Sequence, residues 1–195
     1  MTLRRAIFAA APAAMALAAL ARAAAAMTVL PVDLPAMTGQ AERIFVGRVE
    51  RVTTGRDAHG LPAIWTTFRV TERLKGPAED AVTVKQLGTS LGADDAGVLP
   101  HPALPRYRVG EAVVLFVRPE SALGFTSPVG LGQGCFHVRG RDNAAVVEND
   151  VGNHNLAAPT APRTLAAPEA AAAPPAPLPL DAFLARVRGL VDAER

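Results

Sequence analysis

The fold of this chain is decided by the stretch Ile64-Trp65-Thr66-Thr67-Phe68-Arg69-Val70-Thr71-Glu72-Arg73-Leu74. Successive side chains of a β-strand point to opposite faces of a sheet, so residues two apart share a face. One face of this stretch is mainly apolar and is predicted to lie on the core: Ile64, Thr66, Phe68, Val70 and Leu74. The other face carries Trp65, Thr67, Arg69, Thr71 and Arg73. The alternation predicts a half-buried strand that ends at Lys75-Gly76-Pro77.

Shorter β-type runs flank this strand and are separated by turns that contain glycine. They cover residues 44–52, 81–87, 111–117, 125–131, 135–138 and 145–148. The run Val113-Val114-Leu115-Phe116-Val117 is apolar throughout, which predicts a strand buried on both faces. Residues 88–110 are rich in glycine and proline and predict a long loop. These short runs favour an all-β fold, and we expect a small antiparallel OB-like barrel of five to six strands over residues 41–155.

The segments that flank the predicted barrel differ from it in composition. Residues 27–40 are typical of an extended lead, and residues 36–43 are compatible with a brief helix. In residues 156–179, 17 of 24 positions are alanine or proline, which predicts a semi-extended linker. Residues 180–195 predict an amphipathic helix with Asp181 as its N-cap. Its apolar stripe consists of Phe183, Leu184, Val187, Leu190 and Val191.

Residues 1–26 are typical of an export signal. Arg4 and Arg5 precede an apolar stretch, and Ala24-Ala25-Ala26 supplies the small residues that a signal peptidase needs. The paired arginines also fit a twin-arginine signal. A membrane anchor would need about 20 apolar residues, and this alanine-rich stretch is shorter. We expect cleavage before Met27, a mature chain without a transmembrane segment, and a location in the periplasm or outside the cell.

Removal of the signal changes the net charge. The full sequence has 195 residues and a formal net charge of +2. Three of its 20 basic residues and none of its 18 acidic residues lie in residues 1–26, so 17 basic residues face 18 acidic ones in the mature chain. A nearly neutral chain disfavours nucleic acid as a partner, because phosphate binding depends on clustered positive charge.

No segment carries a complete catalytic or cofactor motif, so we expect no enzyme activity, no cofactor and no metal. Cys135 and His137 share a face of a predicted strand, which would allow a pair of nucleophile and base. Cys135 is more simply interpreted as a small buried hydrophobe. The oxygen-rich residues 148–155 fit a turn better than a calcium loop. Three residues of the long loop could ligate a metal, but they fit no standard ligand spacing: Asp94, Asp95 and His101.

Several turns and strand starts, taken in order, resemble a bacterial exported family. They are Glu42-Arg43-Ile44-Phe45-Val46-Gly47-Arg48-Val49, residues 66–70, Arg73-Leu74-Lys75-Gly76, Val109-Gly110-Glu111 before residues 113–117, and Gly130-Leu131-Gly132-Gln133-Gly134 before Phe136. Members of that family are similar to the OB-like, netrin-type barrel of tissue inhibitors of metalloproteinases, and similar modules accompany matrixin-type proteases. The resemblance covers residues 41–147 and implies a small β-barrel, with inhibition of a metalloprotease as the implied activity.

Two surfaces are candidate binding sites. If the strands at residues 64–74 and 81–87 are neighbours, one outward face gathers an aromatic ring and cations that could hold an anionic glycan: Trp65, Arg69, Arg73 and Lys85. The alternative is an ordinary solvated strand face. The apolar stripe of the C-terminal helix either binds a groove on a partner or docks back onto the barrel.

The sequence therefore favours an exported, non-catalytic binding module for a protein or a cell-envelope component. Two alternatives stay open. The first is an inhibitor of metalloproteases, which the resemblance implies, and the second is a binder of anionic glycans.

Overall fold

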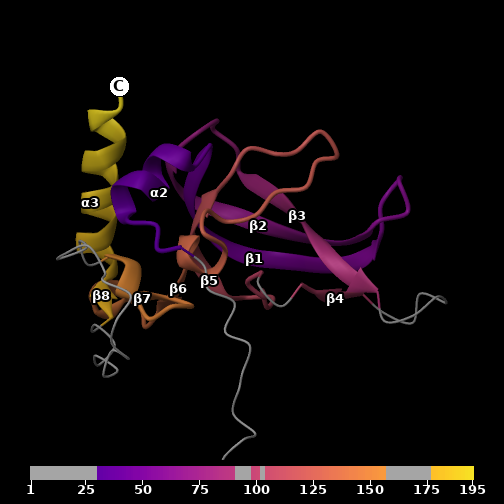
Figure 1. Ribbon diagram of the computed structural model, residues 1–195. Helices are drawn as coiled ribbons and strands as arrows, with labels where there is room; N and C mark the ends of the chain where they lie inside the picture. Colours follow the sequence, from indigo (N-terminus) through magenta and orange to yellow (C-terminus); the bar gives the residue numbers. More distant parts are fainter. Residues whose placement is uncertain (1–29, 91–97, 102–103, 157–176) are drawn as a thin grey trace, which may run out of the picture.

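The computed structural model describes residues 30–90, 98–101, 104–156 and 177–195. In this part of the chain, eight strands form one antiparallel sheet in the order β4-β3-β2-β1-β5-β6-β7-β8 (Figure 1). The strands are β1 (Arg43–Arg56), β2 (Pro62–Lys75), β3 (Ala81–Ser90), β4 (Val98–Pro100), β5 (Ala112–Val117), β6 (Cys135–Arg139), β7 (Val146–Asn149) and β8 (Leu178–Pro179). The helices are α2 (Leu34–Gln40) and α3 (Leu180–Ala193), with short 3-10 turns η1 (Leu131–Gly134), η2 (Asp142–Ala144) and η3 (His154–Leu156). None of the helices described is long and apolar enough to cross a membrane.

The predicted antiparallel β-structure with a C-terminal helix is confirmed, but the predicted number of strands is too low. β4 and β8 were missed because strands of three and two residues are too short to show an alternating pattern. The strand predicted at residues 125–131 is wrong, since only Pro128 forms a bridge, to Val117. Gly130 and Leu131 have φ angles of 62° and 61°, a left-handed conformation that a strand cannot contain.

The segments outside the central sheet also differ from the predictions. The brief helix expected within residues 36–43 is present as α2, which begins earlier, at Leu34, with Asp33 as N-cap, whose side chain accepts from Ala36 N. Residues 27–40 are therefore not extended throughout. The N-cap of α3 is Pro179 rather than Asp181. The end of the predicted linker pairs with β7 as β8, while residues 157–176 and the predicted export signal lie outside the described residues.

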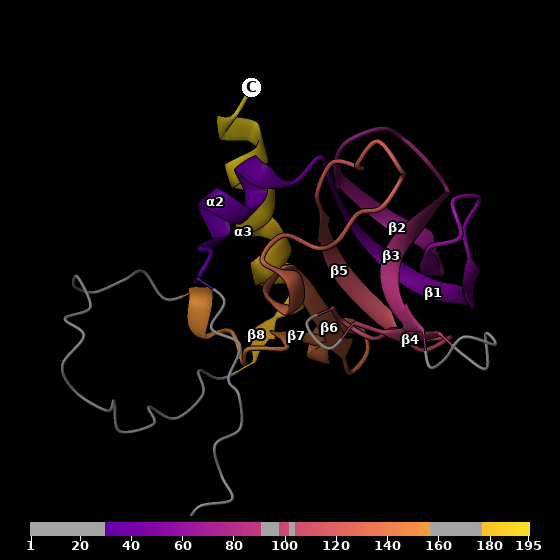
Figure 2. The ribbon, with the colours of Figure 1, turned by 45° about the vertical axis from the view of Figure 1, so that its right-hand side comes forward.

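Two hydrophobic cores lie on opposite faces of the sheet. The helix-side core is covered by α2 and α3, which contact each other on one side of the sheet in both ribbon views (Figures 1 and 2). It contains Leu34, Met37, Ala41, Ile44, Leu74, Val114, Phe116, Val129, Phe136, Val147, Leu156, Phe183, Leu184, Val187 and Val191. On the other face, β1, β2, β3 and β5 curl around a second core, which we call the curl-side core. It contains Phe45, Val49, Phe68, Val82, Val84, Tyr107, Val113, Leu115, Val117 and Cys135.

Because the two cores share one sheet, central strands are buried on both faces. In β5, Val114 and Phe116 lie in the helix-side core, whereas Val113, Leu115 and Val117 lie in the curl-side core. This confirms the prediction from the continuous apolar run. The same division separates Ile44 from Phe45 in β1.

Irregular pairing bends the long hairpin of β1 and β2. The register between them shifts at three places, and such bulges increase the bend and twist of a strand. One shift leaves Thr71 without a direct partner, and another does the same for Leu74. Leu74 consequently packs in the helix-side core, so the prediction that it shares a face with Phe68 is wrong.

The curl does not close as a continuous sheet in the described part of the chain. β4 and β8 are the two ends of the strand order and do not pair with each other. The loop of residues 118–128 partly fills the space between β5 and β3. It bonds to the end of β5 through Arg118 N and Ser127 O (3.1 Å) and to β3 through Thr126 N and Lys85 O (2.9 Å).

Candidate functional site

The predicted glycan surface is only partly assembled. β2 and β3 are neighbours, and Trp65 lies opposite Lys85 in their register, as the hypothesis requires. Arg73, however, lies opposite Phe45, whose side chain belongs to the curl-side core. Directly opposed residues share a face of a sheet. Arg73 therefore projects from the face opposite to Trp65, because the register shift at Thr71 reverses the alternation.

The cations of this surface already have partners within the chain. Lys85 Nζ bonds to Asp57 Oδ2 (2.9 Å) and Leu123 O (2.8 Å), and it lies 4.1 Å from the centre of the Phe125 ring. The hydrogen bond from Lys85 lowers the pKa of Asp57 to about 2. Arg69 Nε bonds to Glu50 Oε1 (2.6 Å). These contacts tie the β1–β2 turn, β3 and the loop of residues 118–128 together, and glycan binding stays a prediction.

The apolar stripe of α3 packs on the chain's own sheet. Phe183, Leu184, Val187 and Val191 are buried, and Leu190 is partly buried against the same core. The ring of Phe183 lies 4.5 Å from that of Phe136, centre to centre. The stripe therefore lies against β6 and its neighbours rather than open to a groove on a partner, in line with the alternative of self-docking.

The arrangement around Cys135 and His137 does not suit nucleophilic catalysis. Cys135 is fully buried, and this burial raises the pKa of its thiol well above the ordinary value. His137 Nδ1 lies 2.6 Å from Glu111 Oε1, and His137 Nε2 lies 2.9 Å from Asp150 Oδ1. The hydrogen bond to Asp150, followed by that to Glu111, raises the pKa of His137 although burial opposes it. A ring that donates from both nitrogens has no lone pair with which to accept the proton of a thiol.

Sequence reasoning missed both carboxylates that hold His137. Glu111 precedes β5, and Asp150 follows β7. Their approach to His137 depends on β6 lying between β5 and β7, so no local spacing could have revealed it.

The oxygen-rich residues 148–155 form a turn held by amide side chains. Asn149 Nδ2 donates to Gln133 O, Asn153 Nδ2 to Val147 O and Asn155 Nδ2 to Val32 O. Amides that donate in this way fix the backbone of the turn. The described residues contain no group of three or more His, Cys, Asp or Glu side chains that could hold a metal ion, and Asp94 and Asp95 lie outside them.

Among the described residues, the first part of β3 has a free strand edge, because β4 pairs only with Gly88, Thr89 and Ser90. In an antiparallel pair of strands, only every second residue is hydrogen-bonded to its direct partner. The bond from Val70 N to Asp80 O continues the register of β2 and β3 and shows which residues these are. Even-numbered residues of β3 therefore bond to β2. Lys85 O bonds instead to Thr126 N, across the other edge. Ala81 and Thr83 share that orientation, and their main-chain N–H and C=O groups have no backbone partner among the described residues.

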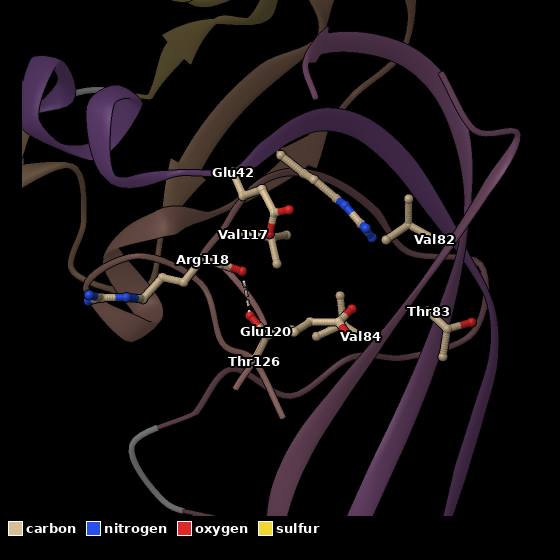
Figure 3. A pocket seen from close by; sticks show the side chains of 9 residues that line it. Glu42, Val82, Thr83, Val84, Val117, Arg118, Glu120 and Thr126 are labelled. Carbon is tan, nitrogen blue, oxygen red and sulfur yellow. Dashed lines mark hydrogen bonds between the residues drawn. The ribbon is translucent and has the colours of Figure 1, made fainter. Parts of the chain in front are cut away.

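A narrow hollow, too small to hold a water molecule, lies beside this edge (Figure 3). Its walls come from β3, the start of β1, the end of β5 and the loop of residues 118–128. The lining residues are Glu42, Arg43, Val82, Thr83, Val84, Val117, Arg118, Glu120 and Thr126. We call this region, together with the free backbone of Ala81 and Thr83, the β3 seam.

Charges in the β3 seam are incompletely paired. Glu42 and Glu120 make no side-chain hydrogen bond or ion pair with any described residue. In Figure 3 both side chains point into the hollow, whereas Arg118 points away from it. Arg43 Nε is buried and lacks a hydrogen-bond partner in the described part of the chain, although Arg43 Nη1 lies 3.6 Å from Glu79 Oε2. The seam thus combines free main-chain groups, two carboxylates and an unused donor.

Comparisons of the chain with models of protein families, with curated proteins and with solved structures found no match. The resemblance to netrin-type barrels therefore stays a prediction from the sequence.

Proposed function

We propose that the chain is an exported, non-catalytic binding module that captures an extended segment of a partner protein, free or in the cell envelope, at the β3 seam. The single observation that carries this proposal is the free main-chain edge at Ala81 and Thr83 beside the hollow. An unpaired strand edge is a template for another strand, and added strands recur in peptide recognition.

The bound segment would also complete the fold. An extended segment paired with Thr83 would lie between β3 and the end of β5, where the curl lacks a strand. The module would then approach the closed OB-like barrel expected from the sequence. The loop of residues 118–128 is held to β3 at Lys85, by the bond from Thr126 N to Lys85 O and by the contacts of Lys85 Nζ with Leu123 O and the Phe125 ring, so an incoming segment would pair with Ala81 and Thr83 beside the loop.

The proposal is tested with a matched pair of substitutions at one residue. Thr83→Pro removes the N–H that faces the seam and leaves the bonds to β2 intact, since proline is tolerated where the N–H of a strand is not used. Thr83→Val keeps this N–H. Both variants lose the contact of Thr83 Oγ1 with Thr67 Oγ1 (3.0 Å), so that this loss cancels in the comparison.

Residues 27–195 of each variant would be panned against a library of displayed peptides, and affinities of enriched peptides measured by calorimetry. We expect Thr83→Pro to weaken binding about tenfold relative to Thr83→Val, because a main-chain hydrogen bond is lost. Equal affinity for the two variants, or no enriched peptide, would overturn the proposal. If Thr83→Pro does not fold by circular dichroism, Ala81→Pro at the first residue of β3 makes the same test against Ala81→Val.

A further inference from the structure

We infer that α3, together with β8, is an exchangeable element that also docks on a second copy of this chain. Its docking surface there is the helix-side face of the sheet, where the ring of Phe183 packs on Phe116 and Phe136 within one molecule. Exchange of α3 does not depend on what binds the β3 seam, because β8 ends the strand order on one side and β3 lies next to its other end.

The first observation is the length of the connection that leads to β8 and α3. Twenty residues, 157–176, separate Leu156 from Pro177. The described residues on both sides of this connection meet at one residue of β7: Asn153 Nδ2 bonds to Val147 O (3.1 Å), and Leu178 pairs with Val147 in the sheet. Twenty residues span about 60 Å when fully extended. This length is not needed to return to β7 of the same molecule, and it is sufficient to reach β7 of a neighbour.

The second observation is that the contacts of α3 and β8 are made with strands that precede the connection. Leu180 N bonds to Ala145 O (2.9 Å), and Arg188 pairs with Glu72 of β2. These contacts and the packing of Phe183 are reproduced when the strands belong to a second copy. The choice between the two copies is then set by the effective concentration of the tethered helix, which is on the order of 1 mM for a flexible connection.

The third observation is that α3 is weak as an isolated helix. Its N-cap, Pro179, makes no side-chain hydrogen bond to the first turn. Gly189 lies inside the helix, and no atom lies within 4 Å of the position that a Cβ would occupy, so packing does not require glycine there. Glycine in a helix and the short length of α3 both disfavour the undocked helix. α3 therefore depends on docking, and either copy provides the surface.

Reciprocal exchange between two copies covers both helix-side cores and closes as a two-fold dimer. The β3 seam lies away from the exchanged elements, so each copy keeps its seam. A dimer with two seams would hold a partner that has two extended segments more tightly than a monomer does.

The test uses two forms of residues 27–195, one with Glu72→Cys and the other, which carries a tag that changes its mass, with Arg188→Cys. The two forms are refolded together from urea and treated with a short bismaleimide, while Cys135 is buried and protected. A crosslinked heterodimer forms when α3 of one copy lies on the sheet of the other. We expect the ratio of heterodimer to monomer to rise about tenfold between about 50 µM and about 500 µM protein, because only docking between copies depends on concentration.

Three further variants complete the test. Arg186→Cys, at an exposed position of α3, replaces Arg188→Cys as the control for random collision. The double variant Glu72→Cys/Arg188→Cys should crosslink within one chain at every concentration. Gly189→Ala should slow exchange between folded chains about fivefold, because it stabilises the docked helix, and it should leave the ratio after joint refolding unchanged.

Heterodimer no more abundant than in the Arg186→Cys control at every concentration would overturn the inference. So would failure of the double variant to crosslink within one chain, since α3 would then not dock beside Glu72. An unchanged exchange rate in Gly189→Ala would show that exchange does not proceed through release of α3, which also refutes it.

Discussion

The two cores of this molecule are divided by a single sheet and differ in how they are closed. On the helix side, two helices cover the sheet, and the rings of Phe116, Phe136 and Phe183 pack together with centres 4.5–6.3 Å apart. On the curl side the sheet encloses its own core, with Tyr107 packed edge-on against Phe68 at 5.0 Å. No helix of the described residues covers this side, and none of them pairs with the backbone of Ala81 and Thr83.

The polar atoms show the same difference. In the described part of the chain, four buried side-chain atoms lack a hydrogen-bond partner: Arg43 Nε, Thr66 Oγ1, Gln86 Nε2 and Tyr107 Oη. Tyr107 belongs to the curl-side core, and the other three residues lie opposite or beside members of it. The buried amides near the helix-side core, Gln133 and Asn149 among them, are bonded. Unsatisfied polar atoms are costly, and natural proteins tend to retain them where function requires them. The comparison therefore associates stability with the helix side and agrees with the proposal of a binding edge on the curl side.

The largest change in stability is expected from a substitution that disrupts the helix-side core. Phe183→Ala should lower the free energy of unfolding by about 3–5 kcal/mol, because it leaves a cavity between α3 and the rings of Phe116 and Phe136. Urea unfolding followed by circular dichroism measures this loss. Phe183→Leu fills much of the same volume and should cost less than half as much. Equal stability of Phe183→Ala and the wild type would show that α3 is not needed to close this core.

The next largest change in stability is expected at His137, at the edge of the curl-side core, and it depends on pH. His137→Gln should lower stability by about 2 kcal/mol at pH 6, through the loss of charge-assisted hydrogen bonds to Asp150 and Glu111. The folded state raises the pKa of His137 above the ordinary value of 6.5, so its contribution is complete below that pH and is lost as pH rises through the raised pKa.

The difference between wild type and His137→Gln should therefore shrink with increasing pH, while the effect of Phe183→Ala stays constant. Unfolding curves at a series of pH values, with the pKa of His137 followed by NMR, provide the measurement. A difference that grows with pH would contradict the contacts described around this ring.

Part of the arrangement of apolar side chains on the two faces of the sheet could be predicted from the sequence. The apolar run from Val113 to Val117 predicted burial on both faces of β5, and the alternation in β2 placed Phe68 on the core. The bulge that sends Leu74 to the other core could not be predicted, because it depends on the pairing with β1. Local patterns describe which side chains are apolar and alternate, whereas bulges arise between strands.

The candidate site was harder to foresee for the same reason. Trp65 and Lys85 were predicted to share one face on the condition that their strands are neighbours, and the strands are neighbours. The binding role expected for Lys85 did not take account of Asp57, which the β1–β2 turn brings to it. Nothing in the residues around Thr83 shows that this strand has a free edge, because an edge is defined by the strand that is missing beside it.

The smallest expected effect concerns an unsatisfied atom on the curl side. Thr66 is fully buried opposite Val84, and its hydroxyl has no partner among the described residues. Thr66→Val keeps the shape of the side chain and removes the desolvated hydroxyl, so stability should increase by about 1 kcal/mol. Thr67→Val is the matched control on the adjacent position, where the hydroxyl bonds to Thr83 Oγ1, and it should bring no gain in stability.

If polar atoms are retained on this side for binding, Thr66→Val should raise the midpoint of urea unfolding without improving the affinity for a peptide bound at the β3 seam. A loss of stability in Thr66→Val would instead mean that the hydroxyl is bonded, through water for example, and that the two cores are equally well satisfied.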